Sequence, residues 1–176
     1  MKILKLRFKN LNSLAGEWSI DFRDSEYQDN GIFAICGSTG AGKTTILDAI
    51  CLALYGETPR LDKVTTKNND IMTHGFGDCY SEVEFETRKG RYISQWSQKR
   101  SRGKSDGKLQ SAKWEVANAD DQRILSEKLK ESQLLIEELT GMNFERFTRS
   151  IMLAQGEFSK FLKSGPDQRS PILEQI

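Results

Sequence analysis

A glycine-rich stretch that follows a run of aliphatic residues decides the fold of this 176-residue chain. It reads Gly37-Ser38-Thr39-Gly40-Ala41-Gly42-Lys43-Thr44 and fits the pattern G-x-x-x-x-G-K-[ST] at every position. The run before it, residues 31–36, is typical of a short strand buried on both faces, and residues 44–55 are typical of an apolar helix that Gly56 ends. A strand, a glycine loop and a helix in this order predict a P-loop that binds a nucleotide.

The residue types of this loop suit a chain of phosphates and a magnesium ion. Its glycines permit backbone angles at which successive amide groups can point at phosphate oxygens. Lys43 can reach the β- and γ-phosphates, Thr44 can place its hydroxyl on Mg²⁺, and Thr45 can approach the α-phosphate. The predicted nucleotide-binding residues of the loop are Gly37, Ser38, Thr39, Gly40, Ala41, Gly42, Lys43, Thr44 and Thr45.

The other motifs of a complete P-loop enzyme are missing from the sequence. A GTPase needs [NT]-K-x-D, and residues 66–70 miss this pattern by one position. The nearest match to an aliphatic strand with a terminal acidic pair, residues 134–138, follows a helical pattern and lacks the aspartate. No LSGGQ-like signature occurs. The sequence therefore supplies half of a catalytic apparatus, and a self-contained kinase or GTPase is the alternative interpretation.

Length and composition predict one soluble domain, and the P-loop between a strand and a helix predicts that it is an α/β domain. Hydrophobic residues make up 37% of the chain and charged residues 29%, so the chain is more polar than an average globular domain but too rich in apolar residues to be disordered. No apolar run approaches the roughly 20 residues that a membrane span needs, and the N-terminus does not resemble a signal peptide, so we expect a cytoplasmic protein without membrane contact. The three cysteines have no metal-ligand spacing and are expected to be buried, reduced thiols. His74 is expected to lie in a loop.

Positive charge is concentrated in one segment although the net charge is only +1. Residues 88–113 contain nine basic residues and a single acidic residue, Asp106. Neighbouring positive charges repel one another unless an anion binds them, so this segment is a candidate contact for nucleic acid. A loop exposed only to solvent is the alternative. The predicted contact residues are Lys99, Arg100, Arg102, Lys104 and Lys108.

Hydrophobic periodicity predicts the remaining elements. Alternating apolar residues at 4–8 and 18–22 predict an antiparallel strand pair, and residues 80–117 predict an antiparallel strand subdomain whose hairpin tip is the basic stretch. Trp96 and Trp114 are expected to pack beneath these strands. A helix is predicted from an N-cap at Ser126 to residue 139, and a second one over residues 144–153.

Several segments together resemble the SbcC family, the ATPase subunits of bacterial SbcCD nucleases and SMC-like relatives of ABC ATPases. The resemblance covers essentially the whole chain and is more specific than the P-loop alone. The residues that carry it lie at 2–14, 31–35, 37–45, 47–55, 57–60 and 146–158.

The resemblance implies a P-loop NTPase fold of the ABC-type head, with residues 1–176 as its N-terminal lobe and C-terminal helices leading toward a coiled coil. It implies that the missing motifs belong to a separate C-terminal lobe, and that this chain alone is nearly inactive. Two such heads would enclose ATP and Mg²⁺ and work with an SbcD-type nuclease on double-stranded DNA ends and hairpins, in the nucleoid.

The resemblance also implies roles for residues outside the P-loop. Gln155 corresponds to the Q-loop glutamine, which helps to hold Mg²⁺ and the attacking water, and would act in catalysis together with Lys43. Asn12 and Ser13 correspond to a loop beside the nucleotide.

Overall fold

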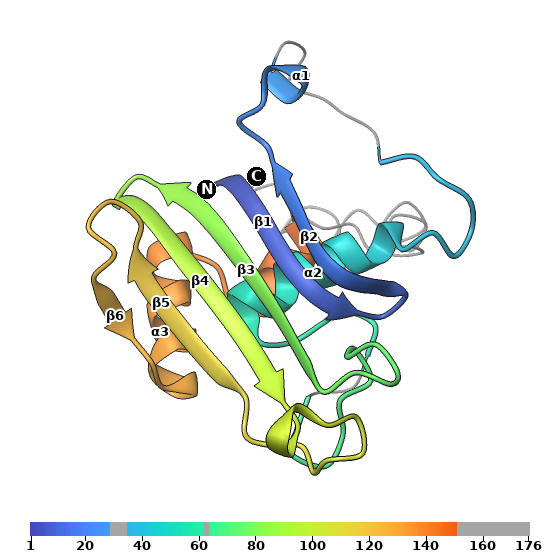
Figure 1. Cartoon of the computed structure of the whole chain (residues 1–176). Coiled ribbons are helices and arrows are strands. Elements are labelled where there is room, and N and C mark those ends of the chain that lie inside the picture. The colour runs from blue at the N-terminus through green and yellow to red at the C-terminus, as the bar shows by residue number, and fades with distance from the viewer. Residues whose placement is uncertain (29–34, 62–63, 151–176) are drawn as a thin grey trace, which may run out of the picture.

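One antiparallel sheet with helices on one face forms the body of the protein (Figure 1). The computed structural model describes residues 1–28, 35–61 and 64–150. Within them the six strands are ordered β2-β1-β3-β4-β5-β6. In chain order the elements are β1 (Lys2–Leu11), β2 (Leu14–Asp21), α1 (Ser25–Gln28), α2 (Lys43–Tyr55), β3 (Asp78–Thr87), β4 (Gly90–Lys99), the 3-10 helix η1 (Ser101–Gly103), β5 (Lys113–Asn118), β6 (Ile124–Ser126), α3 (Leu129–Thr140) and α4 (Phe144–Ser150).

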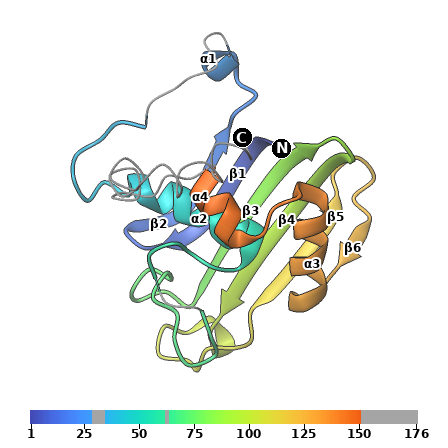
Figure 2. The ribbon, with the colours of Figure 1, turned by 180° about the vertical axis from the view of Figure 1, so that it is seen from behind.

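The alternating pattern of the strands separates an apolar face from a charged face. On β1 and β3 the side chains of Leu6, Phe8, Val83 and Phe85 are buried, and the residues between them are mostly charged. Figure 2 shows that α2 and α3 lie over the same face of the sheet, which is therefore the apolar one. The predicted antiparallel pair of β1 and β2 is confirmed.

The strands within residues 80–117 are antiparallel, as the sequence predicted, and they continue the sheet that β1 begins. The reason is that β1 pairs with β3 along its second edge, where Leu6 lies opposite Val83. The hairpin of β3 and β4, the strand β5 and the buried positions of Trp96 and Trp114 are as predicted.

Hydroxyl groups of the sheet fasten α2, the helix that follows the P-loop. The Ser81 hydroxyl donates to the carbonyl of Ala49 at 2.7 Å, and the Ser94 hydroxyl donates to that of Ala53 at 2.7 Å. The indole nitrogen of Trp114 donates to the Ser94 hydroxyl at 2.9 Å. The helix ends at Gly56 in the left-handed conformation, as the sequence predicted.

The helix predicted from Ser126 begins later. Ser126 belongs to the short edge strand β6, which the sequence did not predict, and the N-cap of α3 is Lys128. The Ser126 hydroxyl still reaches α3, because it shares a hydrogen bond of 3.0 Å with the Ser132 hydroxyl. Gly141 ends α3, and α4 begins at Phe144 as predicted. Residues 151–153 of that helix lie outside the described residues.

The cysteine prediction is correct for two residues and wrong for the third. Cys51 and Cys79 are buried, and burial raises the pKa of each thiol to about 12. Cys36 is exposed. It is the last residue of the predicted strand 31–36, of which residues 31–34 lie outside the described residues, and it has no regular secondary structure. Within the described ranges, no helix combines the length and the apolar character needed to cross a bilayer.

A candidate nucleotide site

Two glycines of the P-loop adopt conformations that other residues rarely take. Gly40 and Gly42 have φ of 83° and 86°, in the left-handed region. Gly42 is the N-cap of α2, and a Cβ at this position would lie 2.7 Å from the Leu14 side chain. Glycine at this position therefore lets the loop turn directly into the helix, whose N-terminus favours an anion.

The Lys43 side chain folds back over the loop. Its ammonium group donates to the carbonyls of Gly37 at 2.6 Å and Ser38 at 2.8 Å. Both partners are neutral, so the positive charge is not cancelled by a carboxylate and is available to an anion at the loop.

A cleft of about 490 Å³ lies along the loop. This volume is within the range of about 300–1,000 Å³ typical of small-molecule sites. Asn12 and Ser13, from the turn between β1 and β2, line it together with residues of the P-loop. The structure therefore places the turn and the P-loop, both predicted to contact the nucleotide, at the same cleft. The remaining lining residues are Thr39, Gly40, Gly42, Lys43, Thr44, Thr45, Arg60 and Leu61.

A buried carboxylate behind the P-loop was not identified from the sequence. Asp48, on the second turn of α2, is 1% exposed and forms an ion pair with the guanidinium of Arg60. The Asn12 amide donates to the Asp48 carboxylate at 3.4 Å and to the Thr45 hydroxyl at 3.3 Å. Asp48 is the one acidic residue of α2, and a buried carboxylate needs a partner. The need of Asp48 for a cationic partner was the one feature of the sequence that could have pointed to Arg60.

Of the two predicted metal contacts, Thr44 and Gln155, only Thr44 lies within the described residues. Thr44 lines the cleft at the start of α2, where its hydroxyl suits a nucleotide-bound Mg²⁺. Gln155 lies outside the described residues. Among the described residues, no group of three or more histidine, cysteine, aspartate or glutamate side chains is arranged to hold a metal ion.

The basic segment forms the hairpin tip that the sequence predicted. Ser101 N donates to the carbonyl of Lys108 at 2.9 Å, and Gln110 N donates to that of Lys99 at 2.9 Å. Arg100 is half-buried, and its guanidinium donates to the carbonyl of Gly107 at 3.1 Å. The other four predicted contact residues, Lys99, Arg102, Lys104 and Lys108, are exposed.

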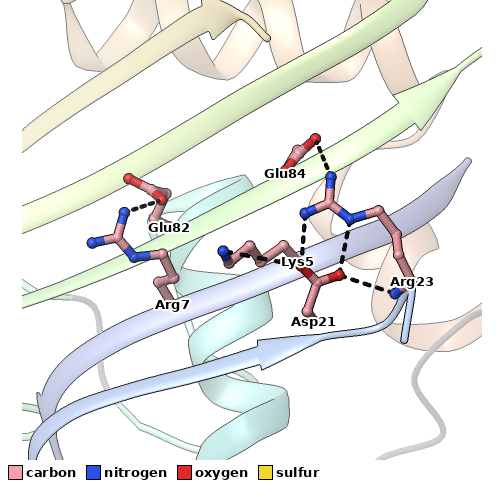
Figure 3. Close-up of polar contacts among 6 residues, drawn as sticks. All are labelled: Lys5, Arg7, Asp21, Arg23, Glu82 and Glu84. Atoms are coloured by element: carbon pink, nitrogen blue, oxygen red, sulfur yellow. Dashed lines mark hydrogen bonds and ion pairs between the residues drawn. The ribbon is translucent and has the colours of Figure 1, made fainter. Parts of the chain in front are cut away.

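The charged face of the sheet differs from this basic loop, because its cations are paired (Figure 3). Arg7 contacts Glu82 at 3.2 Å, and Arg23 contacts Glu84 at 3.1 Å. Hydrogen bonds from Arg23 lower the pKa of Asp21 to about 2. Within residues 1–28, 35–61 and 64–150, no ion pair involves the four exposed cations of the basic loop. Their charge is therefore open to a partner.

Comparison with known proteins agrees with this geometry. A protein-family model described as an AAA domain matches residues 5–176. The SbcC subunit of the SbcCD nuclease from Pseudomonas aeruginosa is 42% identical and that from Rhodobacter capsulatus 38% identical; each match covers 100% of this chain and 16% of the relative. The probable DNA double-strand break repair Rad50 ATPase of Aquifex aeolicus is 30% identical over 98% of this chain and 16% of its own length. The chain thus spans about one sixth of these relatives.

A solved structure described as "Structural biochemistry of ATP-driven dimerization and DNA stimulated activation of SMC ATPases" has the same fold. It superposes with a TM-score of 0.65 at 19% identity and covers 99% of this chain and 98% of its own. The predicted α/β P-loop head fold and the resemblance to SbcC are both confirmed.

Proposed function

The chain belongs to the AAA-domain family and matches part of SbcC proteins over its whole length, and from this premise we propose that it is the ATP-binding half of a DNA-repair ATPase. The complete ATPase would drive a nuclease complex that processes DNA ends and hairpins. The observation that carries the proposal is that the P-loop, Asn12 and Ser13, and Arg60 line the same cleft.

The residues of this chain would bind and orient the triphosphate. The amides of the glycine loop and the N-terminus of α2 would hold the phosphate oxygens, and the Lys43 ammonium would leave its carbonyl acceptors for the β- and γ-phosphates. Thr44 would place its hydroxyl on Mg²⁺, which neutralises phosphate charge when bound. Gln155 would orient water and metal. The ion pair with Asp48 would fix the Arg60 guanidinium at the mouth of the cleft.

Hydrolysis would need groups that the described residues do not supply. In this proposal the general base and the signature motif come from the C-terminal lobe and from a second head that closes over ATP. An SbcD-type nuclease is the proposed catalytic partner, and the proposed location is the nucleoid region of the cytoplasm. The similarity to SbcC proteins does not favour a self-contained kinase or GTPase.

Reconstitution from the two halves tests whether ATP hydrolysis needs groups from the C-terminal half. We expect the chain alone to hydrolyse Mg-ATP near the background rate and to gain activity when the C-terminal half is added. Lys43→Ala should abolish the reconstituted activity, because the phosphate contacts are lost, and Lys5→Ala on the charged face should not. Robust ATPase activity of the chain alone, lost in Lys43→Ala, would instead support a self-contained enzyme.

The basic loop is the proposed contact for double-stranded DNA. Because its exposed cations are unpaired within the described part of the chain, they can replace the counterions of the DNA backbone, with little dependence on sequence. Replacing Arg102, Lys104 and Lys108 by Ser in the reconstituted head should lower the slope of log K against log salt by about 0.9 for each lost phosphate contact. An unchanged slope would show that the loop is only solvated.

A further inference from the structure

A second cavity, of about 650 Å³, lies between the basic loop and the polar segment 67–76. Asn12 lines both this cavity and the nucleotide cleft, so the two adjoin. We call it the loop cavity. Its lining includes Phe76 from one segment and Arg100, Ser105 and Leu109 from the basic loop.

The walls of the loop cavity are fixed by buried hydrogen bonds. The Asn69 side chain accepts hydrogen bonds from the amides of Ile71 at 3.1 Å and Met72 at 2.8 Å, and donates to Gln98 Oε1 at 2.6 Å. This network ties segment 67–76 to the end of β4. On the other side, Arg100 N donates to the carbonyl of Gly77 at 2.7 Å. The cavity is therefore preformed rather than an opening between loose segments.

Close packing of the loop adds to this rigidity. A Cβ on Gly77 would lie 2.0 Å from the carbonyl oxygen of Gly103, so only glycine lets the basic loop approach so closely. The positions of the loop cations relative to segment 67–76 are thus set by the backbone.

The charges that line the loop cavity do not favour a simple anion. Lys67 and Arg100 are offset by two carboxylates, Asp70 and Asp106, and Asp70 already accepts a hydrogen bond from Asn68 at 2.7 Å. Two polar groups of the lining, Thr73 Oγ1 and Arg100 Nε, are buried and have no hydrogen-bond partner among the described residues. The lining therefore contains a guanidinium and polar side chains without a net positive charge.

An aromatic side chain distinguishes the cavity further. Phe76 is 38% exposed, although it is a large apolar residue, and it sits on a turn that its own amide closes by donating to the Thr73 carbonyl at 3.2 Å. An aromatic face together with a guanidinium matches a ligand that contains both a flat base and a phosphate. A nucleotide unit combines the two.

We propose that the loop cavity binds one unpaired nucleotide of a DNA strand, with its base on Phe76 and its phosphate near Arg100. This inference rests on the proposed DNA contact of the basic loop. Inside a duplex, neighbouring bases cover both faces of each base, and at a blunt end the terminal base stays paired, so an unpaired nucleotide is the unit that can enter the cavity and place its base on Phe76. The volume fits a single nucleotide, and the exposed cations of the loop follow the adjoining backbone.

The test compares a blunt duplex with the same duplex carrying a short single-stranded overhang, using the full-length protein. We expect the overhang to bind about tenfold more tightly, which is the scale of stacking one base on an aromatic side chain. A 2-aminopurine at the first unpaired position should lose fluorescence on binding. Phe76→Ser should abolish both effects without changing affinity for the blunt duplex, and Phe76→Tyr should retain them. Leu134→Ser, an exposed apolar position on α3, is the matched control.

The outcomes separate this inference from the proposed function. Equal, salt-dependent binding of the two DNAs by the wild-type protein would overturn the loop-cavity inference and leave the DNA contact standing. Loss of the overhang preference in Leu134→Ser as well as in Phe76→Ser would also overturn it. The absence of any DNA binding would overturn both. Equal quenching of free 2-aminopurine deoxynucleotide would contradict the assignment to a DNA strand.

Discussion

Replacing Ser94 by Ala should destabilise the protein more than the same change at Ser81. Both serines are fully buried on the apolar face of the sheet, and both donate to carbonyls of α2 at 2.7 Å. Their surroundings differ in two respects. Ser94 also accepts a hydrogen bond from the indole of Trp114, and its carbonyl partner, Ala53, lies in the last turn of α2, where helix carbonyls lack intrahelical donors.

The two sites therefore predict different losses of stability. In Ser81→Ala the carbonyl of Ala49 keeps its place in the helix ladder, so the cost is that of one hydrogen bond, about 1 kcal/mol. In Ser94→Ala the indole N–H is left buried without an acceptor, which adds about 1–3 kcal/mol. We expect the free energy of unfolding to fall by about 2–4 kcal/mol in Ser94→Ala.

Urea unfolding of both variants, followed by circular dichroism and tryptophan fluorescence, measures the difference. The Ser94 variant should have the lower midpoint at an unchanged slope, since the surface exposed on unfolding is nearly the same. Equal losses in the two variants would refute the reasoning, because they would mean that the Trp114 indole finds another acceptor or is not held by Ser94.

Four further perturbations test other parts of the structure. Arg60→Ala should weaken Mg-ATP binding severalfold in calorimetry, because its guanidinium lines the cleft; unchanged affinity would remove it from the site. Asn69→Ala should lower the free energy of unfolding by about 2–4 kcal/mol, since several buried partners lose their hydrogen bonds, and a loss below about 1 kcal/mol in urea unfolding would contradict the network. With a thiol reagent at pH 8, Cys36 should react rapidly and the two buried thiols only after denaturation. Because the buried thiols keep their protons to a pKa of about 12 while unfolded ones release them near 9.0, stability should fall as pH rises above 9.0; a flat profile from pH 8 to 10 would contradict this.

Local patterns carried most of the correct predictions. The P-loop and α2 follow from residue types at fixed spacing, and the long strands follow from alternation, because one face of each is buried. The predicted cap at Ser126 was wrong, because Ser126 belongs to β6, and a strand of three residues at the edge of a sheet leaves no periodic signal. The single continuous sheet depends on Leu6 meeting Val83, a contact between distant parts of the chain.

In the candidate site too, residues of a sequence motif could be predicted, whereas contacts that depend on the fold could not. Lys43 and Thr44 are recognisable from the motif, whereas the contact of Asp48 with Arg60 arises only when the connection after α2 folds back over the helix. The exposure of Cys36 was missed because an apolar neighbourhood in sequence does not fix which side chains a loop buries.

Calorimetric titration of Mg-ATP into the wild-type chain, Lys43→Ala and Lys5→Ala tests the central claim most directly. If the glycine loop holds the phosphates, the wild type should bind one nucleotide, Lys43→Ala should lose at least about tenfold in affinity, the scale of one charge-assisted contact, and Lys5→Ala should match the wild type. Equal affinity in Lys43→Ala and wild type, or no binding by the wild type, would contradict the assignment of this cleft to ATP.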